Sequence, residues 1–164
     1  MKNVSLGVEF VNPFVTAAFS MMSMVLGETP TKGDVFAQPR DTTNQQVNVV
    51  LGVTGDVQGN VMLGMTLPMA DRIASTMIGQ TVITFDELAA SALAELGNMI
   101  SGNALQNLAS NGLNCDLAPP TLIRGTNIAI STAAIPSIVI CLKLSLGEVY
   151  LTLGLQRRQV PNAA

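Results

Sequence analysis

The feature that most constrains the fold of this 164-residue chain is an order of hydrophobic patterns that occurs twice. Residues 10–67 contain an apolar stretch with helical spacing, a loop region, and two runs in which every second residue is apolar. The same order returns in residues 85–155. A period of 3.6 predicts a helix and a period of two predicts a half-buried strand, so the chain is expected to contain two similar halves. Its length fits one ordinary domain, and we interpret residues 1–164 as a single domain.

The first half is predicted to begin with a helix. Asn12 followed by Pro13 is typical of a helix start, because an N-cap side chain precedes a residue whose fixed φ suits the first turn. Residues 14–26 continue with helical spacing. Residues 28–46 are rich in proline, glycine and polar residues, so they are predicted to be mainly loop with at most one short strand at 34–38.

A hairpin and two further helices are expected next. Alternating apolar residues predict an antiparallel hairpin in residues 47–67, and Pro68 is predicted to open a second helix. Thr84 and Glu87 have the spacing of a capping box, which predicts that the third helix starts at Phe85.

The second half returns to extended structure after the third helix. A short strand is predicted at residues 121–124 and a hairpin at 137–155, with its turn at Leu146 and Gly147. Helices on one side of a mainly antiparallel sheet would bury both sets of apolar faces. The predicted fold class is therefore α+β, with two similar helix-plus-hairpin halves that share one sheet.

Composition narrows the classes of function. Hydrophobic residues make up 48% of the chain and charged residues only 12%, which suggests that a partner or a second copy covers apolar surface. The net charge of −3 and the lack of a basic run argue against a nucleic-acid partner. The apolar runs are interrupted well short of the roughly 20 residues that cross a bilayer, and the N-terminus lacks a secretory pattern. We expect a cytoplasmic protein with no membrane partner.

The chain also lacks the usual residues of metal and nucleophilic catalysis. It has no histidine, and Cys115 and Cys141 do not have metal-ligand spacing. No metal site is predicted, and any chemistry must use carboxylates, amides or groups of a partner. A small-molecule hydrolase is disfavoured because no Ser/His pair or glycine-rich phosphate loop is present.

A polar stripe runs along the third predicted helix. Ser91, Glu95, Asn98 and Gly102 fall on one face only about 60° wide, separate from the apolar stripe. Gly102 costs about 1 kcal/mol relative to alanine inside a helix, which suggests that something approaches the backbone closely there. Spacing alone also fits a face that is simply solvated, so both interpretations stay open at this point.

The same residues resemble the motif of a known family. Ser91, Glu95, Asn98 and Pro120 are separated by three, two and twenty-one residues, which is the spacing of the signature in the CheC, CheX and FliY phosphatases of bacterial chemotaxis. Three further stretches are similar: VNPF near the N-terminus, LGVTGDVQGNVML in the first hairpin, and ELGNMISGNA around the motif. The first predicted helix has no Glu-x-x-Asn, and a single copy of this motif is typical of the CheX type.

The resemblance implies hydrolysis of the aspartyl phosphate on a phosphorylated CheY-type response regulator. Asn98 is then expected to position the attacking water, and Glu95 to dock on the lysine in the partner's active site. From their small size and their spacing, Ser91 and Gly102 are expected to let the partner's loops approach. Pro120 is expected to shape the loop after the helix.

Cofactor and assembly follow from the same resemblance. No cofactor of the chain's own is expected, because the response regulator would bring Mg²⁺. A homodimer is implied by the CheX type. The alternative is a non-catalytic module of the same fold, a response-regulator-binding or flagellar-switch adaptor, in which the helix face is an interface only.

Overall fold

The computed structural model describes residues 8–39, 42–125, 127–129 and 135–159. Within these ranges the chain forms three helices and nine strands, most of which belong to one antiparallel sheet. The helices are α1 (Val8–Leu26), α2 (Leu67–Ile78) and α3 (Glu87–Ser110). The strands are β1 (Thr31–Gln38), β2 (Thr42–Thr43), β3 (Val47–Gly55), β4 (Val57–Met65), β5 (Cys115–Leu117), β6 (Thr121–Arg124), β7 (Ile128–Ala129), β8 (Ser137–Leu144) and β9 (Gly147–Arg157).

The sheet confirms the prediction of two similar halves. Its strand order is β1-β8-β9-β4-β3. Both β5 and β6 pair with β3 on the edge opposite to β4. The hairpins β3-β4 and β8-β9 meet through β4 and β9 at the centre. Strand β1 of the first half extends the hairpin of the second half, and β6 of the second half extends the hairpin of the first. The short pair β2-β7 joins the halves in the same way.

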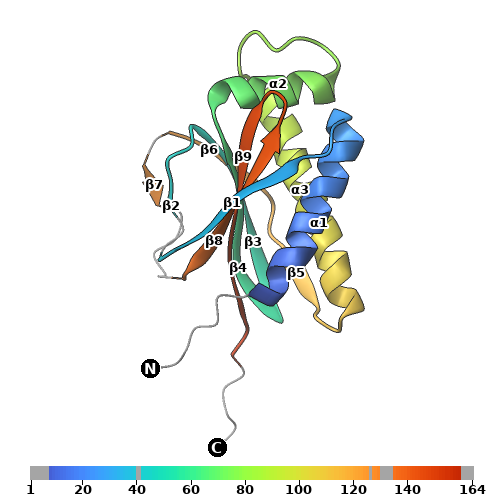
Figure 1. The fold of residues 1–164 in the computed structure, drawn as a ribbon, viewed down its shortest axis with the longest axis vertical. Helices are drawn as coiled ribbons and strands as arrows, with labels where there is room; N and C mark the ends of the chain where they lie inside the picture. The colour runs from blue at the N-terminus through green and yellow to red at the C-terminus, as the bar shows by residue number, and fades with distance from the viewer. Residues whose placement is uncertain (1–7, 40–41, 126, 130–134, 160–164) are drawn as a thin grey trace, which may run out of the picture.

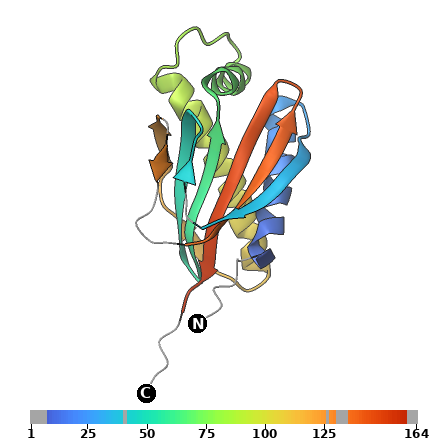
Figure 2. The same ribbon diagram turned by 60° about the vertical axis from the view of Figure 1, so that its left-hand side comes forward.

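The helices cover one face of this sheet, as the α+β prediction requires. Helices α1 and α3 lie side by side on that face, and α2 lies across one end of the sheet (Figures 1 and 2). The core between them consists of alternate strand residues, which on β3 are Val47, Val49, Leu51 and Val53. Each strand therefore contributes every second side chain to the contact with the helices.

The opposite face of the sheet is partly covered by the polar segment that follows β2. Thr43 Oγ1 donates a hydrogen bond of 2.9 Å to Asn48 Oδ1, and Asn48 Nδ2 donates to the carbonyl oxygen of Gln45 at 2.9 Å. Asn48 and Thr43 are buried, so these bonds satisfy polar groups that would otherwise cost about 1–3 kcal/mol each. The sequence did not indicate a role for this polar segment. In the structure, hydrogen bonds from Thr43 and to Gln45 hold it against Asn48 of β3.

Helix α1 begins earlier than predicted. The helix starts at Val8 and Pro13 lies inside it, so the predicted start at Asn12 and Pro13 is wrong. Phe10 and Phe14 are both buried in the core, and their packing outweighs the local signal. Pro13 occupies the second turn, where it removes a single hydrogen bond of the helix ladder.

The apolar character of α1 has a structural explanation. By length and composition, Glu9–Leu26 could cross a membrane, although 44% of this window is buried inside the protein. Its buried side chains pack in the core, among them Phe10, Phe14 and Met22. The hydropathy of α1 therefore matches that of a helix with one face in a protein core.

Strand β1 is longer than the short strand predicted at 34–38. It runs from Thr31 to Gln38 and pairs with β8, with an irregularity in register between Lys32 and Val35. Most of its side chains are exposed, because β1 is an edge of the sheet. An exposed edge does not show the alternation from which strands are recognised in a sequence. Residues 81–84, whose sequence TVIT is rich in β-branched residues that favour strands, form no strand in the structure.

The stability of this arrangement is expected to depend on Gly97, where α3 lies closest to β3. A Cβ atom on Gly97 would lie 2.9 Å from Val49 Cγ1, whereas one on Gly102 would have nothing within 4 Å. Gly97→Ala should lower the free energy of unfolding by about 1 kcal/mol, since overpacking of about 1–3 kcal/mol exceeds the gain in helix propensity.

Gly102→Ala is the matched control and should raise the free energy of unfolding by about 0.5–1 kcal/mol. Urea unfolding of the two variants measures the difference. Equal stability of the two variants would show that the contact between α3 and β3 tolerates a methyl group.

Candidate functional site

The helix that carries the predicted site begins two residues later than the sequence indicated. Asp86 is the N-cap of α3, and its Oδ1 accepts a hydrogen bond of 3.0 Å from the backbone N–H of Ala89. The predicted capping box of Thr84 and Glu87, with a start at Phe85, is therefore wrong. Aspartate is a better N-cap than threonine. In addition, the guanidinium of Arg124 lies over the ring of Phe85, with its Cζ atom 5.3 Å from the ring centroid, and this contact holds Phe85 before the helix.

The four predicted residues of the stripe lie together on the outward face of α3. Ser91, Glu95 and Asn98 are exposed and Gly102 is half-buried, while the opposite face of the helix packs in the core. Within the described part of the chain, no hydrogen bond or ion pair engages the side chains of Ser91, Glu95 or Asn98. A carboxylate and a carboxamide are thus presented one turn apart on a rigid element, free to interact with another molecule.

The two glycines of α3 have different roles. Gly97 is buried against Val49 and Leu51, and its lack of a side chain lets the helix approach the sheet. Gly102 borders open space, so none of the residues that the structure describes explains its lack of a side chain. The sequence drew attention to Gly102 and not to Gly97, although Gly97 falls between the core residues Ala104 and Leu108 on the helical wheel.

Pro120 does not belong to this stripe. It lies between β5 and β6, and both of these strands pair with β3. The N–H of Ala118 in the same connection donates to the carbonyl oxygen of Gly52 at 2.9 Å. Since proline has a fixed φ and no N–H, Pro120 fits a connection that changes direction between two short strands.

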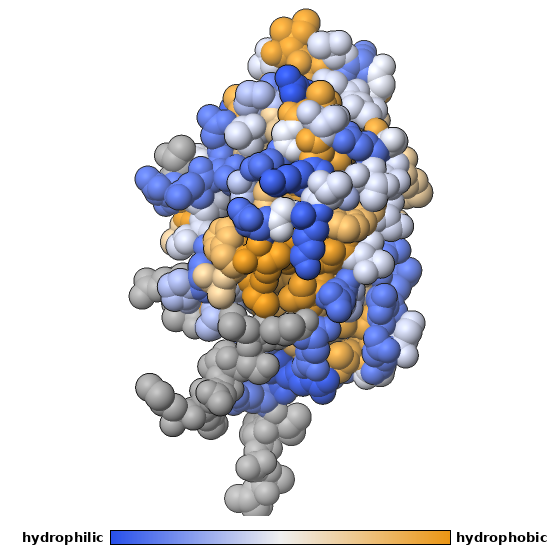
Figure 3. Space-filling view, in the orientation of Figure 1, coloured by the Kyte–Doolittle hydropathy of each residue, from blue (hydrophilic) through white to orange (hydrophobic). Residues whose placement is uncertain are grey.

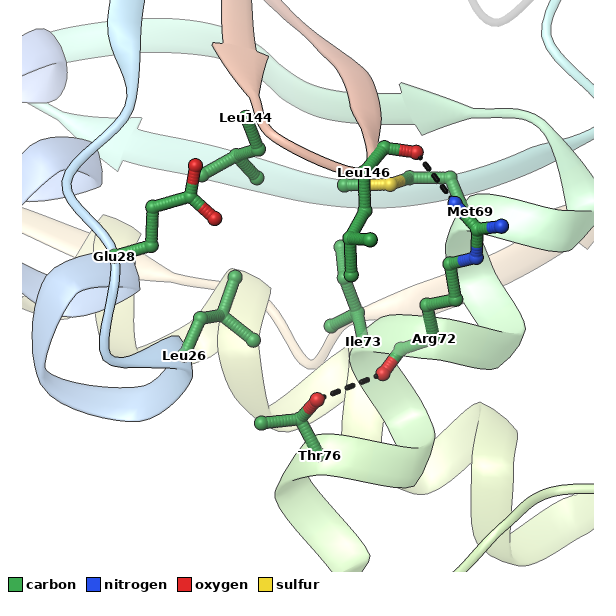
Figure 4. Close-up of a pocket in the computed structure, with 8 residues that line it drawn as sticks. All are labelled: Leu26, Glu28, Met69, Arg72, Ile73, Thr76, Leu144 and Leu146. Carbon is green, nitrogen blue, oxygen red and sulfur yellow. Dashed lines mark hydrogen bonds between the residues drawn. The ribbon is translucent and has the colours of Figure 1, made fainter.

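A small, partly open pocket between α2 and the turn that joins β8 to β9 offers no alternative active site (Figure 4). Its volume is about 40 Å³, enough for a few water molecules but not for an organic substrate. Arg72 Nη1 donates to the carbonyl oxygen of Leu146 at 2.7 Å, and the Glu28 carboxylate accepts from the N–H and the Oγ of Ser145 at 2.6 and 2.8 Å. These charged groups hold α2 and the end of α1 to the turn between β8 and β9.

The groups with raised pKa values also lie away from α3. A hydrogen bond of 2.7 Å from the Tyr150 hydroxyl to Glu148, aided by burial, raises the pKa of Tyr150 to about 12. Burial raises the pKa of the Cys141 thiol. Both groups stay protonated at neutral pH and are poor nucleophiles. Among the residues that the structure describes, no three Cys, Asp or Glu side chains gather as a metal site.

The site geometry therefore favours positioning of a reactant over chemistry by a nucleophile. An amide can donate one hydrogen bond and accept another, which is what orienting a water molecule requires. A free carboxylate can pair with a cation of another molecule. Both groups need that molecule to bring the reacting bond to the face of α3.

A family model, a relative with a known activity and solved structures all point to the same protein family. The family model for the chemotaxis phosphatase CheX matches residues 47–143, which is more than half of the chain and includes Ser91, Glu95, Asn98, Gly102 and Pro120. The chain is 29% identical to the CheY-P phosphatase CheX of Thermotoga maritima over 123 residues, which are 74% of this chain and 79% of that protein.

Solved structures agree with this match. A chemotaxis protein CheX from Desulfovibrio desulfuricans is similar with a TM-score of 0.81 at 28% identity, over 92% of this chain and 100% of the other. CheX in a CheX–CheY–BeF₃–Mg²⁺ complex from Borrelia burgdorferi is similar with a TM-score of 0.77 at 26% identity, over 90% and 98% of the two chains.

The cap of the helix that carries the site can be tested directly. Asp86→Ala is expected to lower the free energy of unfolding by about 1 kcal/mol, because the N–H of Ala89 loses its acceptor. Thr84→Ala is the control and should change it by less than about 0.5 kcal/mol. Denaturant titration measures both. A larger loss for Thr84→Ala would restore the capping box that the sequence indicated.

Proposed function

Because this chain belongs to the CheX family of chemotaxis phosphatases, we propose that it hydrolyses the aspartyl phosphate of a phosphorylated CheY-type response regulator. The observation that carries the proposal is the free pair of Glu95 and Asn98 on the exposed face of α3. The relative from Thermotoga maritima is a CheY-P phosphatase, and the relative from Borrelia burgdorferi forms a complex with CheY.

In the proposed reaction Asn98 holds a water molecule in line with the phosphorus atom. The water oxygen forms a bond to phosphorus while the bond from phosphorus to the aspartate oxygen breaks. Dihydrogen phosphate and a free aspartate carboxylate result, so both protons of the water leave with the phosphate, which then equilibrates with the solvent. An acyl phosphate is already activated, so correct positioning of the water supplies much of the rate gain.

Glu95 has a docking role in this proposal. It lies three residues before Asn98, about 4.5 Å along the helix axis, on the same face. We propose that its carboxylate pairs with the lysine in the partner's active site and so sets the register of α3 in that site. An ion pair at an interface contributes more to orientation than to net affinity.

The partner is proposed to complete the site. The chain would need no cofactor of its own, since we propose that the response regulator would bring Mg²⁺; the complex of the relative from Borrelia burgdorferi contains CheY, BeF₃ and Mg²⁺. Ser91 and Gly102 are proposed to lie under the partner's loops. Serine is small and glycine has no side chain, so a partner can approach the backbone of α3 on both sides of Glu95 and Asn98.

We also propose that the protein is a cytoplasmic homodimer. Strand β1 is an edge of the sheet, and its Val35 and Phe36 side chains are 48% and 47% exposed. An apolar region is visible at the middle of the face shown in Figure 3. An unpaired apolar edge is a site at which a second copy of the chain can pair. A non-catalytic adaptor of the same fold is the alternative, and it predicts binding without hydrolysis.

Substitution of Asn98 and Glu95 tests the mechanism. Asn98→Ala is expected to abolish the acceleration of phosphate loss from the phosphorylated response regulator, because the water loses its positioning group. Glu95→Ala is expected to reduce kcat/KM by about 100-fold, because the register of α3 would be lost and the partner's lysine would be left without an ion pair; such a truncation costs about 2.7 kcal/mol even where the intact pair adds little net affinity. The decay of phosphorylated regulator is followed with and without the protein.

The matched control is Asn103→Ala, an exposed asparagine of the same helix outside the stripe. Its activity should equal that of the wild type. Full activity of Asn98→Ala would exclude the proposed mechanism. Binding of the phosphorylated regulator by the wild type without any acceleration would favour the adaptor.

A large side chain at Gly102 tests whether the partner approaches α3 closely at this position. Gly102→Leu is expected to lower kcat/KM by about tenfold, because a bulky side chain would hold the partner away by a contact worth about 1.4 kcal/mol. The fold should persist, since a side chain at Gly102 enters open space. Asn103→Leu is the control with the same new side chain outside the stripe. Activity of Gly102→Leu equal to that of this control would show that no partner approaches there.

A further inference from the structure

We propose that Leu88 and Ile83 form an apolar anchor that binds the response regulator beside the catalytic stripe and contributes to KM, not to kcat. This inference rests on the proposed function, because its occupant is the same phosphorylated regulator. The anchor is formed by the first turn of α3 and the loop before it, which joins α2 to α3.

Leu88 continues the stripe toward the start of α3. It lies seven residues before Glu95, so the two side chains project in directions only about 20° apart around the helix axis. Leu88 is 55% exposed although it is a large aliphatic residue. The stripe thus changes along the helix from small and polar residues to an apolar one.

Ile83 adds a second apolar side chain at the same end of the molecule. It is 92% exposed, and an apolar projection is visible at the top of the molecule, where the loop between α2 and α3 lies (Figures 1 and 3). Exposure of an isoleucine to this degree leaves nearly all of its apolar surface in water.

The loop around Ile83 is held in place by its neighbours. The N–H of Val82 donates to Ser75 Oγ at 2.9 Å, Phe85 packs under Arg124, and Asp86 caps α3. Ile83 is therefore presented in a fixed position between bonded residues. Because the loop is already ordered, a partner that covers Ile83 loses little conformational entropy.

The usual size of a protein interface places Leu88 at the edge of the area that the same partner would cover, and Ile83 lies beyond it in the loop. Ten residues separate Leu88 from Asn98, which is about 15 Å along the helix. A standard interface covers about 800 Å² on each protein and is therefore roughly 30 Å across. A regulator centred on Asn98 would reach Leu88.

The stripe itself needs such a contribution to binding. Ser91 and Gly102 offer little apolar area, and an ion pair at Glu95 contributes little net affinity. Burial of apolar side chains supplies affinity without depending on the phosphoryl group. Leu88 and Ile83 would therefore hold the regulator while Asn98 and Glu95 provide orientation.

The test separates binding from chemistry. Leu88→Ser, Ile83→Ser and the double variant are compared with wild type over a range of concentrations of a phosphorylated CheY-type regulator that the wild type dephosphorylates. The double variant is expected to raise KM about tenfold with kcat unchanged within about twofold. The dissociation constant of the beryllofluoride-activated regulator should rise by the same factor.

The matched control is Leu146→Ser. Leu146 is also 55% exposed, but it lies on the turn between β8 and β9, away from α3. Its KM should equal that of the wild type. Circular dichroism and thermal unfolding verify that each variant is folded, which is expected because the substituted side chains are exposed.

Three outcomes would overturn the inference in distinguishable ways. An active double variant with wild-type KM removes the anchor and leaves the proposed function intact. A change of solution mass in the double variant, measured by light scattering, would instead assign the patch to contact with a second copy of the chain. Wild-type protein that accelerates no regulator would remove the proposed function and the anchor together.

Discussion

The close contact of α3 with β3 at Gly97 is the constraint on which the rest of the structure depends. With no side chain at this position, the helix approaches Val49 and Leu51 closely, and Leu93, Leu96 and Ile100 then fill the core around the contact. A helix pressed so closely against a sheet has a fixed rotation about its axis, because turning it would drive a larger side chain into the strands. The outward direction of Glu95 and Asn98 is thus determined by packing on the opposite side of α3.

The sheet beneath this contact is rigid for a topological reason. Each half of the chain supplies a hairpin, and the outer strand added to each hairpin belongs to the other half. Neither half can separate without breaking the central pairing of β4 with β9 and both outer pairings. Strand β3, which supports α3, is paired on both edges, with β4 on one side and with β5 and β6 on the other. The site helix therefore lies on one of the best-supported strands of the protein.

Sequence periodicity predicted the parts of this structure that depend on local pattern. Three predictions are confirmed: both hairpins, the helix that begins near Pro68, and the common face of Ser91, Glu95, Asn98 and Gly102. Errors arose where distant contacts decided the outcome: the buried ring of Phe10 extends α1 past Pro13, and Arg124 holds Phe85 outside α3. Gly97 was missed because the structural value of a glycine depends on the partner strand, which a helical wheel does not show. The exchange of outer strands between the halves is likewise a property of the whole sheet.

The proposed division of the active site between two proteins would explain why the candidate residues have no special environment in this chain. A group that must enter a partner's site has to be exposed, so burial does not mark it. The small pocket beside α2 and the raised pKa values of Tyr150 and Cys141 lie elsewhere. What the fold can supply is a rigid direction for a water-positioning amide, and rigidity is the property that the packing of α3 provides. Selectivity for one regulator then has to come from surface around the stripe. A contact such as the proposed anchor, which would add affinity without touching the phosphoryl group, can supply that selectivity without changing how the proposed water-positioning amide is held.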